Sequence, residues 1–196
     1  EWKDGDRIRQ VIAEEIPGEP WRQAELLALQ AQMAGRLAAA RDHWSHAIGA
    51  GAPAAQAEYQ RGLLARQQGD LAAARSDFLR ALEGQQPAPG AARELALLAL
   101  SGGDSAEARR YLTRYLEAAG PDRDSLQLAA VVETNLGDTA AALHAVRDAR
   151  RLVGDQSKSA ELEARVHARA ADAAGAVEAL RPLAREGIVD RAALRA

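Results

Sequence analysis

Glycine recurs at a fixed spacing along most of this chain. Gly35, Gly69, Gly103 and Gly137 are separated by equal steps of 34 residues, and one further step of the same length reaches Ala171. A constant period of this length is typical of stacked helical hairpins, because each unit can bury its apolar face only against its neighbours. The period therefore predicts an all-α repeat protein.

The residue that follows these positions also indicates a helical hairpin. An aspartate follows all but the first of them, at Asp70, Asp104, Asp138 and Asp172. Gly readily takes the left-handed conformation that ends one helix, and an Asp side chain can accept a backbone N–H at the start of the next. Arg36 holds this place in the first unit, so we expect a weaker helix cap there.

Three further columns of residues keep the same phase. The small residues form two columns, namely Ala28, Gly62, Ala96, Ala130 and Ala164, and then Ala40, Ala74, Ala108, Ala142 and Ala176. The larger residues form one column, namely Trp44, Phe78, Leu112, Val146 and Leu180. Small residues allow two helices to cross closely, and the larger side chains fill the space beside the crossing. We expect all three columns to be buried.

Composition narrows the classes of function. A formal net charge of -3 and the lack of a local run of Lys or Arg argue against a nucleic-acid partner. The chain has 0 Cys, which excludes disulfides and thiolate chemistry. It also has no apolar stretch of about 18 residues, so we expect no membrane span.

The order of small, turn and bulky residues resembles the tetratricopeptide repeat (TPR) superfamily. In the second repeat the matching residues are Gly62, Gly69, Asp70, Ala74, Phe78, Ala81 and Pro87. The resemblance implies a right-handed α-solenoid of helix-turn-helix repeats. The predicted repeats are 21–54, 55–88, 89–122, 123–156 and 157–190.

The two ends of the chain depart from this pattern. Residues 1–20 are predicted to form a helix of an incomplete upstream repeat, and residues 191–196 the truncated start of a further helix. We expect a piece of a longer protein that can self-associate through these ends. The fifth repeat is degenerate, and because Pro182 removes a helical hydrogen bond, we expect its second helix to kink or end near Arg181.

In this superfamily the first helix of each hairpin lines a concave groove, so the resemblance implies a protein- or peptide-binding surface. The corresponding residues are Glu25, Leu29, Gln32, Tyr59, Leu63, Arg66, Arg93, Leu97, Gln127, Val131 and Thr134. The same rows continue to Glu161 and Arg165 in the fifth repeat. Tyr59, Arg66 and Arg93 are expected to be exposed anchors. For Leu63 and Leu97, packing within the hairpins is favoured over exposure in the groove.

The sequence offers no catalytic residues and no cofactor site. It lacks a glycine-rich phosphate loop, a nucleophile elbow and a paired-carboxylate arrangement. His43 and His46 share a helix face, but no third ligand is in phase with them, so no metal site is predicted. We therefore expect a protein that is not an enzyme.

These observations predict a non-enzymatic scaffold or adaptor that binds a peptide or partner helix within a bacterial multiprotein assembly. The segment 108–161 is also similar to TPR lipoproteins of type IV pilus biogenesis, although the fifth repeat continues beyond the expected end of such a protein. That similarity favours the periplasm or the inner face of the outer membrane over the cytoplasm. The alternative is a regulatory or sensor module of a larger regulator.

Overall fold

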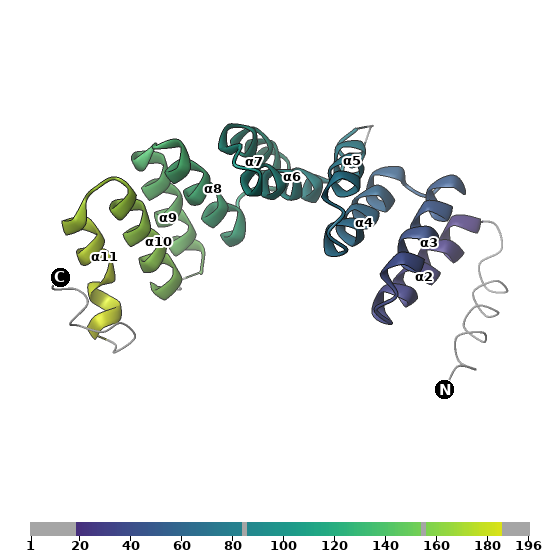
Figure 1. Ribbon diagram of the computed structural model, residues 1–196, viewed down its shortest axis with the longest axis horizontal. Coiled ribbons are helices and arrows are strands. Elements are labelled where there is room, and N and C mark those ends of the chain that lie inside the picture. Colours follow the sequence, from purple (N-terminus) through teal and green to yellow (C-terminus); the bar gives the residue numbers. More distant parts are fainter. Residues whose placement is uncertain (1–18, 84–85, 154–155, 186–196) are drawn as a thin grey trace. The chain divides into compact units, whose positions relative to one another are not determined.

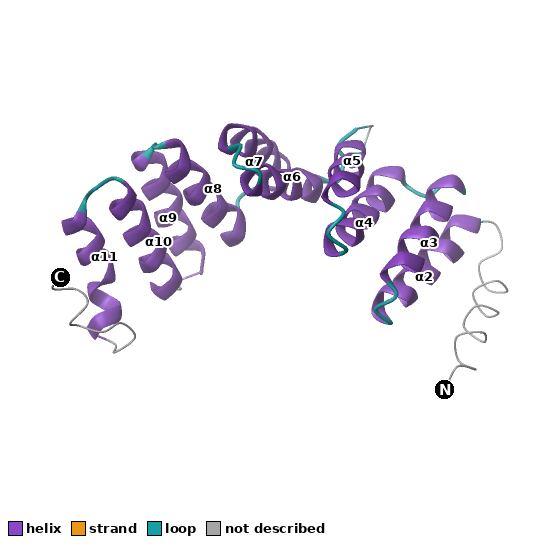
Figure 2. Ribbon diagram, in the orientation of Figure 1, coloured by secondary structure: helices purple, strands orange, loops and turns teal. Residues whose placement is uncertain are grey.

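The computed structural model describes residues 19–83, 86–153 and 156–185. Within these residues there are ten α-helices and no strands (Figure 2). The predicted all-α fold class is therefore confirmed. The chain divides into two compact units, Glu1–Leu95 and Ala96–Ala196, and each unit is considered by itself.

The first unit contains two helical hairpins and the start of a further helix (Figure 1). Its helices are α2 (Pro20–Met33), α3 (Leu37–Gly49), α4 (Ala54–Gln67) and α5 (Leu71–Ala81), followed by the first part of α6 (Pro89–Ser101). Helix α2 pairs with α3, α4 pairs with α5, and α3 also contacts α4. The two hairpins of this unit are thus stacked on each other.

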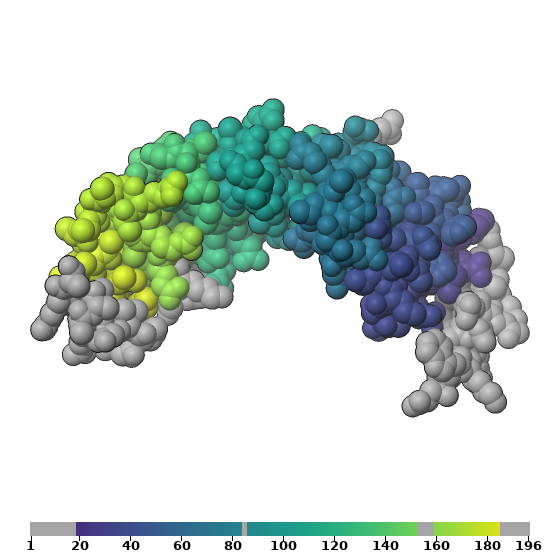
Figure 3. Space-filling view, in the orientation of Figure 1, coloured from purple at the N-terminus to yellow at the C-terminus, as the bar shows by residue number. Residues whose placement is uncertain are grey.

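The second unit begins within α6 and continues the same arrangement. Its further helices are α7 (Ser105–Ala119), α8 (Arg123–Leu136), α9 (Thr139–Val153), α10 (Gln156–Arg169) and α11 (Ala173–Arg185). Helices α8 and α9 form one hairpin and α10 and α11 form another. Helix α10 contacts both α8 and α9, so these two hairpins pack against each other. In Figure 3 the atoms of this part of the chain, coloured green to yellow, form one continuous surface.

The turn inside each hairpin has the predicted left-handed backbone. The φ angles are +70° at Gly35, +81° at Gly69, +84° at Gly103, +80° at Gly137 and +58° at Ala171. Ala171 is the only residue other than glycine with a positive φ in the described part of the chain. The turn at Ala171 therefore has the same left-handed backbone conformation as the four glycine turns. Because a residue with a side chain is strained in this conformation, the turn at Ala171 is less stable than a glycine turn.

The predicted aspartate caps are confirmed as well. Asp70, Asp104, Asp138 and Asp172 accept hydrogen bonds from the backbone N–H groups of Ala73, Glu107, Ala141 and Gly175, respectively. Arg36 makes no side-chain cap at the start of α3, as expected. A reciprocal capping box that the sequence analysis did not single out joins Asp122 and Ser125 at the start of α8.

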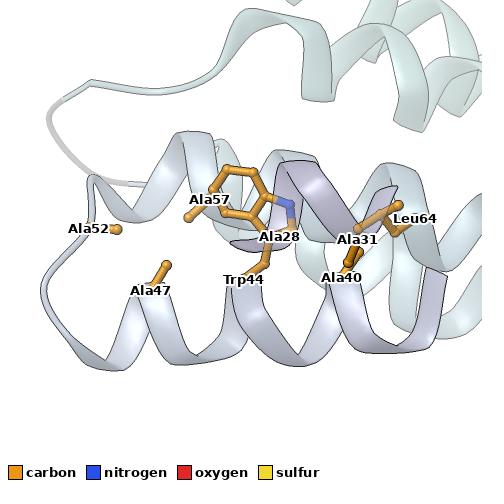
Figure 4. Packing of buried hydrophobic residues seen from close by; sticks show 8 residues of the cluster. All are labelled: Ala28, Ala31, Ala40, Trp44, Ala47, Ala52, Ala57 and Leu64. Carbon is orange, nitrogen blue, oxygen red and sulfur yellow. The ribbon is translucent and has the colours of Figure 1, made fainter. Parts of the chain in front are cut away.

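The three columns form the core, and two of them are less buried towards the end of the chain. The first four members of each column are buried. In the fifth hairpin Ala164 is buried, whereas Ala176 and Leu180 are half-buried. In the first unit, the indole of Trp44 extends from α3 towards Ala28 of α2 and Ala57 of α4 (Figure 4).

The last helix was expected to kink or end near Arg181, and the expectation of an early end is wrong, whereas the kink remains a prediction. Helix α11 continues to Arg185 with Pro182 inside it. Leu183 and Ala184, which follow the proline, are 0% and 5% exposed, and their burial offsets the hydrogen bond that Pro182 cannot donate. The helix predicted over residues 1–20 and the one starting at 191 lie outside the described residues, apart from Glu19 and Pro20 at the start of α2. The repeat boundaries remain predictions.

Candidate protein-binding surface

The predicted groove residues all lie on the first helices of the hairpins. In the first unit they come from α2, α4 and the start of α6, and in the second unit from the rest of α6 and from α8. Leu29 and Arg66 are exposed. The half-buried members are Glu25, Gln32, Tyr59, Leu63, Arg93, Leu97, Gln127, Val131 and Thr134. None of the predicted residues is fully buried, so each one presents some surface.

In the second unit, a depression of about 430 Å³ lies between α8 and α10. Its lining residues are Gln127, Leu128, Val131, Glu161, Leu162 and Arg165. The structure therefore brings two rows together at this depression. Gln127 and Glu161 belong to the first row, with Glu25, Tyr59 and Arg93, and Val131 and Arg165 belong to the second, with Leu29, Leu63 and Leu97. Leu128 and Leu162 are buried and supply apolar surface, whereas Glu161 and Arg165 are exposed.

The sequence analysis missed Leu128 and Leu162. Each directly follows a member of the first row, Gln127 or Glu161, and neither belongs to the rows that were read from the repeat pattern. The hydrophobic neighbours of a groove row carry no separate signal, because leucines that line a depression and leucines inside a hairpin occur with the same spacing.

In the first unit, Arg66 and Arg93 meet at Glu94, a residue that the sequence analysis did not select. The Nη1 atom of Arg66 lies 3.0 Å from Oε2 of Glu94, and the Nη2 atom of Arg93 lies 3.9 Å from Oε1. The Glu94 side chain is only 4% exposed, while those of Arg66 and Arg93 are 42% and 32% exposed. An acidic residue beside an arginine on a helix usually indicates a solvated face, so this burial could not be predicted from the sequence.

Tyr59 is fixed by packing rather than standing free in a groove. Its ring centroid lies 6.0 Å from that of Phe78, and a Cβ added to Gly90 would be 2.8 Å from the Tyr59 hydroxyl. Burial raises the pKa of the Tyr59 phenol, and the negative charge of Glu94 raises it further. The expected exposure holds for Arg66, whereas Tyr59 and Arg93 are half-buried because they pack around Glu94 and Gly90.

Of the other predicted groove residues, some are exposed and some pack within the hairpins. Leu97 packs against the core cluster that contains Leu112 and Val132, and Leu63 is half-buried. Leu29 is 40% exposed. The hydroxyl of Thr134 donates to the carbonyl oxygen of Ala130 at 2.6 Å, so its proton is not available to a partner. Packing within the hairpins thus accounts for Leu97, whereas Leu29 is exposed to solvent.

The described residues contain neither a metal-binding cluster nor a helix that could span a membrane. No group of three or more His, Cys, Asp or Glu side chains is placed to hold a metal ion there. His43 is half-buried and His46 is exposed on α3. None of the described helices combines the length and the apolar character that a membrane span requires.

A solenoid of helical hairpins with a left-handed turn every 34 residues is the architecture of TPR proteins. Comparison with solved structures shows that TPR proteins share the fold of this chain. A TPR protein from Parabacteroides merdae is similar with a TM-score of 0.79 and 15% identity, over 88% of this chain and 69% of that one. YrrB, described as a TPR protein with an unusual peptide-binding site, has a TM-score of 0.75 and 18% identity, over 88% of this chain and 89% of its own.

A third similar structure is PilW, a widely conserved type IV pilus biogenesis factor. It has a TM-score of 0.64 and 19% identity, over 79% of this chain and 71% of its own. No protein-family model and no curated protein matches the sequence. At these identities the comparison shows the fold alone, which is an all-α arrangement of helical hairpins like that of the TPR structures.

Proposed function

We propose that this chain is a non-enzymatic scaffold that binds a peptide or a helix of another protein through the first helices of its hairpins. The observation that supports the proposal most directly is the depression between α8 and α10, where residues from two successive hairpins line one surface. These residues occupy equivalent positions one repeat apart. A surface that is built from repeat-equivalent positions suits a partner that runs across several hairpins.

The chemistry of the depression also favours a protein partner. Leu128, Val131 and Leu162 supply apolar surface, and Gln127 can both donate to and accept from a peptide backbone. Glu161 and Arg165 add one charge of each sign at exposed positions. An apolar contact bordered by polar groups is the usual composition of a peptide-binding site.

A non-enzymatic role agrees with the same lining. The residues around the depression include one carboxylate, one guanidinium and one amide, with no histidine and no hydroxyl or thiol nucleophile. A hydrolytic or transfer reaction needs a nucleophile beside a base and a group that stabilises the developing charge. This set provides no such combination.

We also propose the kind of assembly in which the scaffold acts. YrrB has a peptide-binding site and PilW acts in pilus biogenesis, and both share this fold. We infer a role in a bacterial envelope assembly such as an export, secretion or pilus system, with binding on the groove rows.

The test is site-specific photo-crosslinking in cells that produce the protein naturally. A photoreactive amino acid is placed at Glu161 or Arg165 and, as a matched control, at Glu117 or Arg147, which are exposed on α7 and α9 and do not line the depression. We expect a discrete protein adduct from positions 161 and 165 only. The double charge reversal Glu161→Arg and Arg165→Glu should abolish an adduct formed from a photoreactive residue at Gln127.

The control variant is Glu117→Arg with Arg147→Glu, which changes the same charges elsewhere and should leave the adduct intact. Circular dichroism confirms that both variants keep their helix content. Adducts that form equally well from positions 117 and 147, or that persist in the Glu161/Arg165 reversal, would place the binding surface elsewhere.

A further inference from the structure

The depression between α8 and α10 has two walls with the same residue spacing. Gln127 and Val131 of α8 form one wall. Glu161 and Arg165 of α10 form the other, and in each wall the two residues are four positions apart. Residues four apart on a helix lie on the same face, with their Cβ atoms about 5–6 Å from each other. Both walls therefore present one side chain per helical turn to the depression.

The apolar part of the depression is more deeply buried than its charged part. Leu128 and Leu162 are 9% and 8% exposed. Glu161 and Arg165, in contrast, are exposed. A partner that fills this space must therefore direct an apolar side chain towards the two leucines and polar side chains towards the rim.

The two charges at the rim are accessible to a partner. Within the part of the chain that the structure describes, no ion pair involves Glu161 or Arg165, whereas the neighbouring Glu163 pairs with Arg150 of α9 at 2.5 Å. Glu161 can attract a cation, and the guanidinium of Arg165 can bind a carboxylate through two parallel hydrogen bonds. Charges of opposite sign one helical turn apart thus call for a partner that carries both signs.

A helix meets these requirements better than an extended chain. In an extended chain, the residue between two side chains of one face points to the opposite face, so an apolar residue cannot lie between two charged ones and share their direction. In a helix, the residue at i+3 lies on the same face as those at i and i+4. An amphipathic helix that packs into a hydrophobic groove is also a common mode of peptide recognition.

We propose that the depression binds an amphipathic helix of the partner protein, with a basic and an acidic residue at positions i and i+4 and a leucine-sized apolar residue at i+3. The basic residue pairs with Glu161, the acidic residue pairs with Arg165, and the apolar residue packs against the two buried leucines. This inference rests on the proposed function and specifies the chemistry of the partner. Since the charges of the partner have the spacing of those on α10, both ion pairs form together.

The experiment measures the binding of three fluorescein-labelled helical peptides by fluorescence anisotropy. The peptides share an alanine-rich sequence with leucine at i+3, and positions i and i+4 hold Lys with Glu, two Lys or two Glu. The wild-type chain should bind the Lys/Glu peptide about fivefold more tightly than either like-charged peptide, because each of those exchanges one attraction for a repulsion.

Single charge reversals test whether Glu161 and Arg165 set this preference. Arg165→Glu leaves two carboxylates at the depression and should bind the Lys/Lys peptide most tightly, whereas Glu161→Arg should prefer the Glu/Glu peptide. Because the peptides are unchanged, a new preference cannot come from differences in their own helix content. The matched controls Arg147→Glu and Glu117→Arg reverse exposed charges on α9 and α7 and should keep the wild-type preference.

Two results would overturn the inference. One is the same order of affinities in the wild-type chain and in both reversals at the depression, and the other is a lack of measurable binding of every peptide. A fourth peptide has proline at i+2 of the Lys/Glu sequence and cannot form the helix. Undiminished binding of this peptide would contradict a helical partner and indicate an extended one.

The outcomes separate this inference from the proposed function. Crosslinking from positions 161 and 165 with one order of peptide affinities in all variants contradicts only the helix that carries both charges. A preference that follows the charges of Glu161 and Arg165, without crosslinking in cells, supports the chemistry of the depression and contradicts the proposed function.

Discussion

Gly62 of α4 lies so close to Phe78 of α5 that a Cβ added to Gly62 would be 2.6 Å from Cε1 of the phenylalanine ring. Both residues are buried, and Phe78 is 0% exposed. The glycine is thus required by its neighbour in the core and not by its own backbone, which is helical. At the equivalent positions in the second unit, alanine replaces Gly62 and a smaller side chain replaces Phe78. The pairs there are Ala96 with Leu112 and Ala130 with Val146.

This relationship predicts that Gly62→Ala destabilises the protein by about 2 kcal/mol, even though alanine favours a helix more than glycine does. The reason is that the ring of Phe78 has to move out of a fully packed site. Phe78→Leu alone should cost about 1 kcal/mol through the space it leaves. The double variant should be no less stable than Phe78→Leu, which urea denaturation can measure. Additive losses would contradict the coupling.

The buried carboxylate of Asp77 predicts a larger loss of stability on substitution than Gly62 does. Arg61 donates from Nε and Nη2 to the two oxygens of Asp77 at 3.0 and 2.7 Å, and Arg80 also pairs with it. Asp77 is 3% exposed, so Asp77→Ala leaves two guanidinium groups without their shared partner and should cost about 3 kcal/mol. The matched control is Asp104→Ala, which removes an exposed helix cap and should cost about 1 kcal/mol. Equal losses of stability in the two variants would show that burial does not increase the contribution of the Asp77 ion pairs to the free energy of unfolding.

The turn at Ala171 predicts a stabilising substitution. Because its φ is +58°, replacement by glycine removes strain, and Ala171→Gly should stabilise the fifth hairpin by about 1 kcal/mol. Hydrogen exchange of the amides in α10 and α11 should slow correspondingly. The converse change, Gly137→Ala at φ +80°, should destabilise the fourth hairpin. Faster exchange in Ala171→Gly would mean that the side chain of Ala171 contributes more than its strain costs.

The cap at Asp122 predicts a dependence on pH. Burial by itself would raise the pKa of this carboxyl, but hydrogen bonds from the Tyr115 hydroxyl and from the amide and hydroxyl of Ser125 outweigh it, so the pKa lies below the ordinary value of 3.8. Stability from the carboxylate is therefore fully present above pH 3.8 and is lost as the pH falls through the folded-state pKa. The difference in unfolding free energy between the wild-type chain and Asp122→Ala should be about 1 kcal/mol at pH 7 and should shrink below pH 4. A difference that is constant from pH 7 to pH 2 would refute this assignment.

The candidate binding surface was only partly predictable from the sequence. The repeat phase identified Gln127, Val131, Glu161 and Arg165 as members of the same rows, and these residues do line one depression. The phase could not show which neighbours form its apolar part, because that depends on how α8 and α10 are rotated against each other. Similarly, Pro182 alone favoured an early end of α11, but the burial of Leu183 extends the helix beyond it.

The sequence by itself determined the hairpin turns, the aspartate caps and the columns of small and large core residues. These features depend on local residue preferences that recur at the same positions of each repeat, so a fixed period is enough to reveal them. Only the tertiary structure decided that Glu94 is buried between Arg66 and Arg93 and that Asp77 is shared by Arg61 and Arg80. The physical reason is that the burial of a charged side chain depends on the partners that neighbouring helices bring to it, and no local preference encodes those partners.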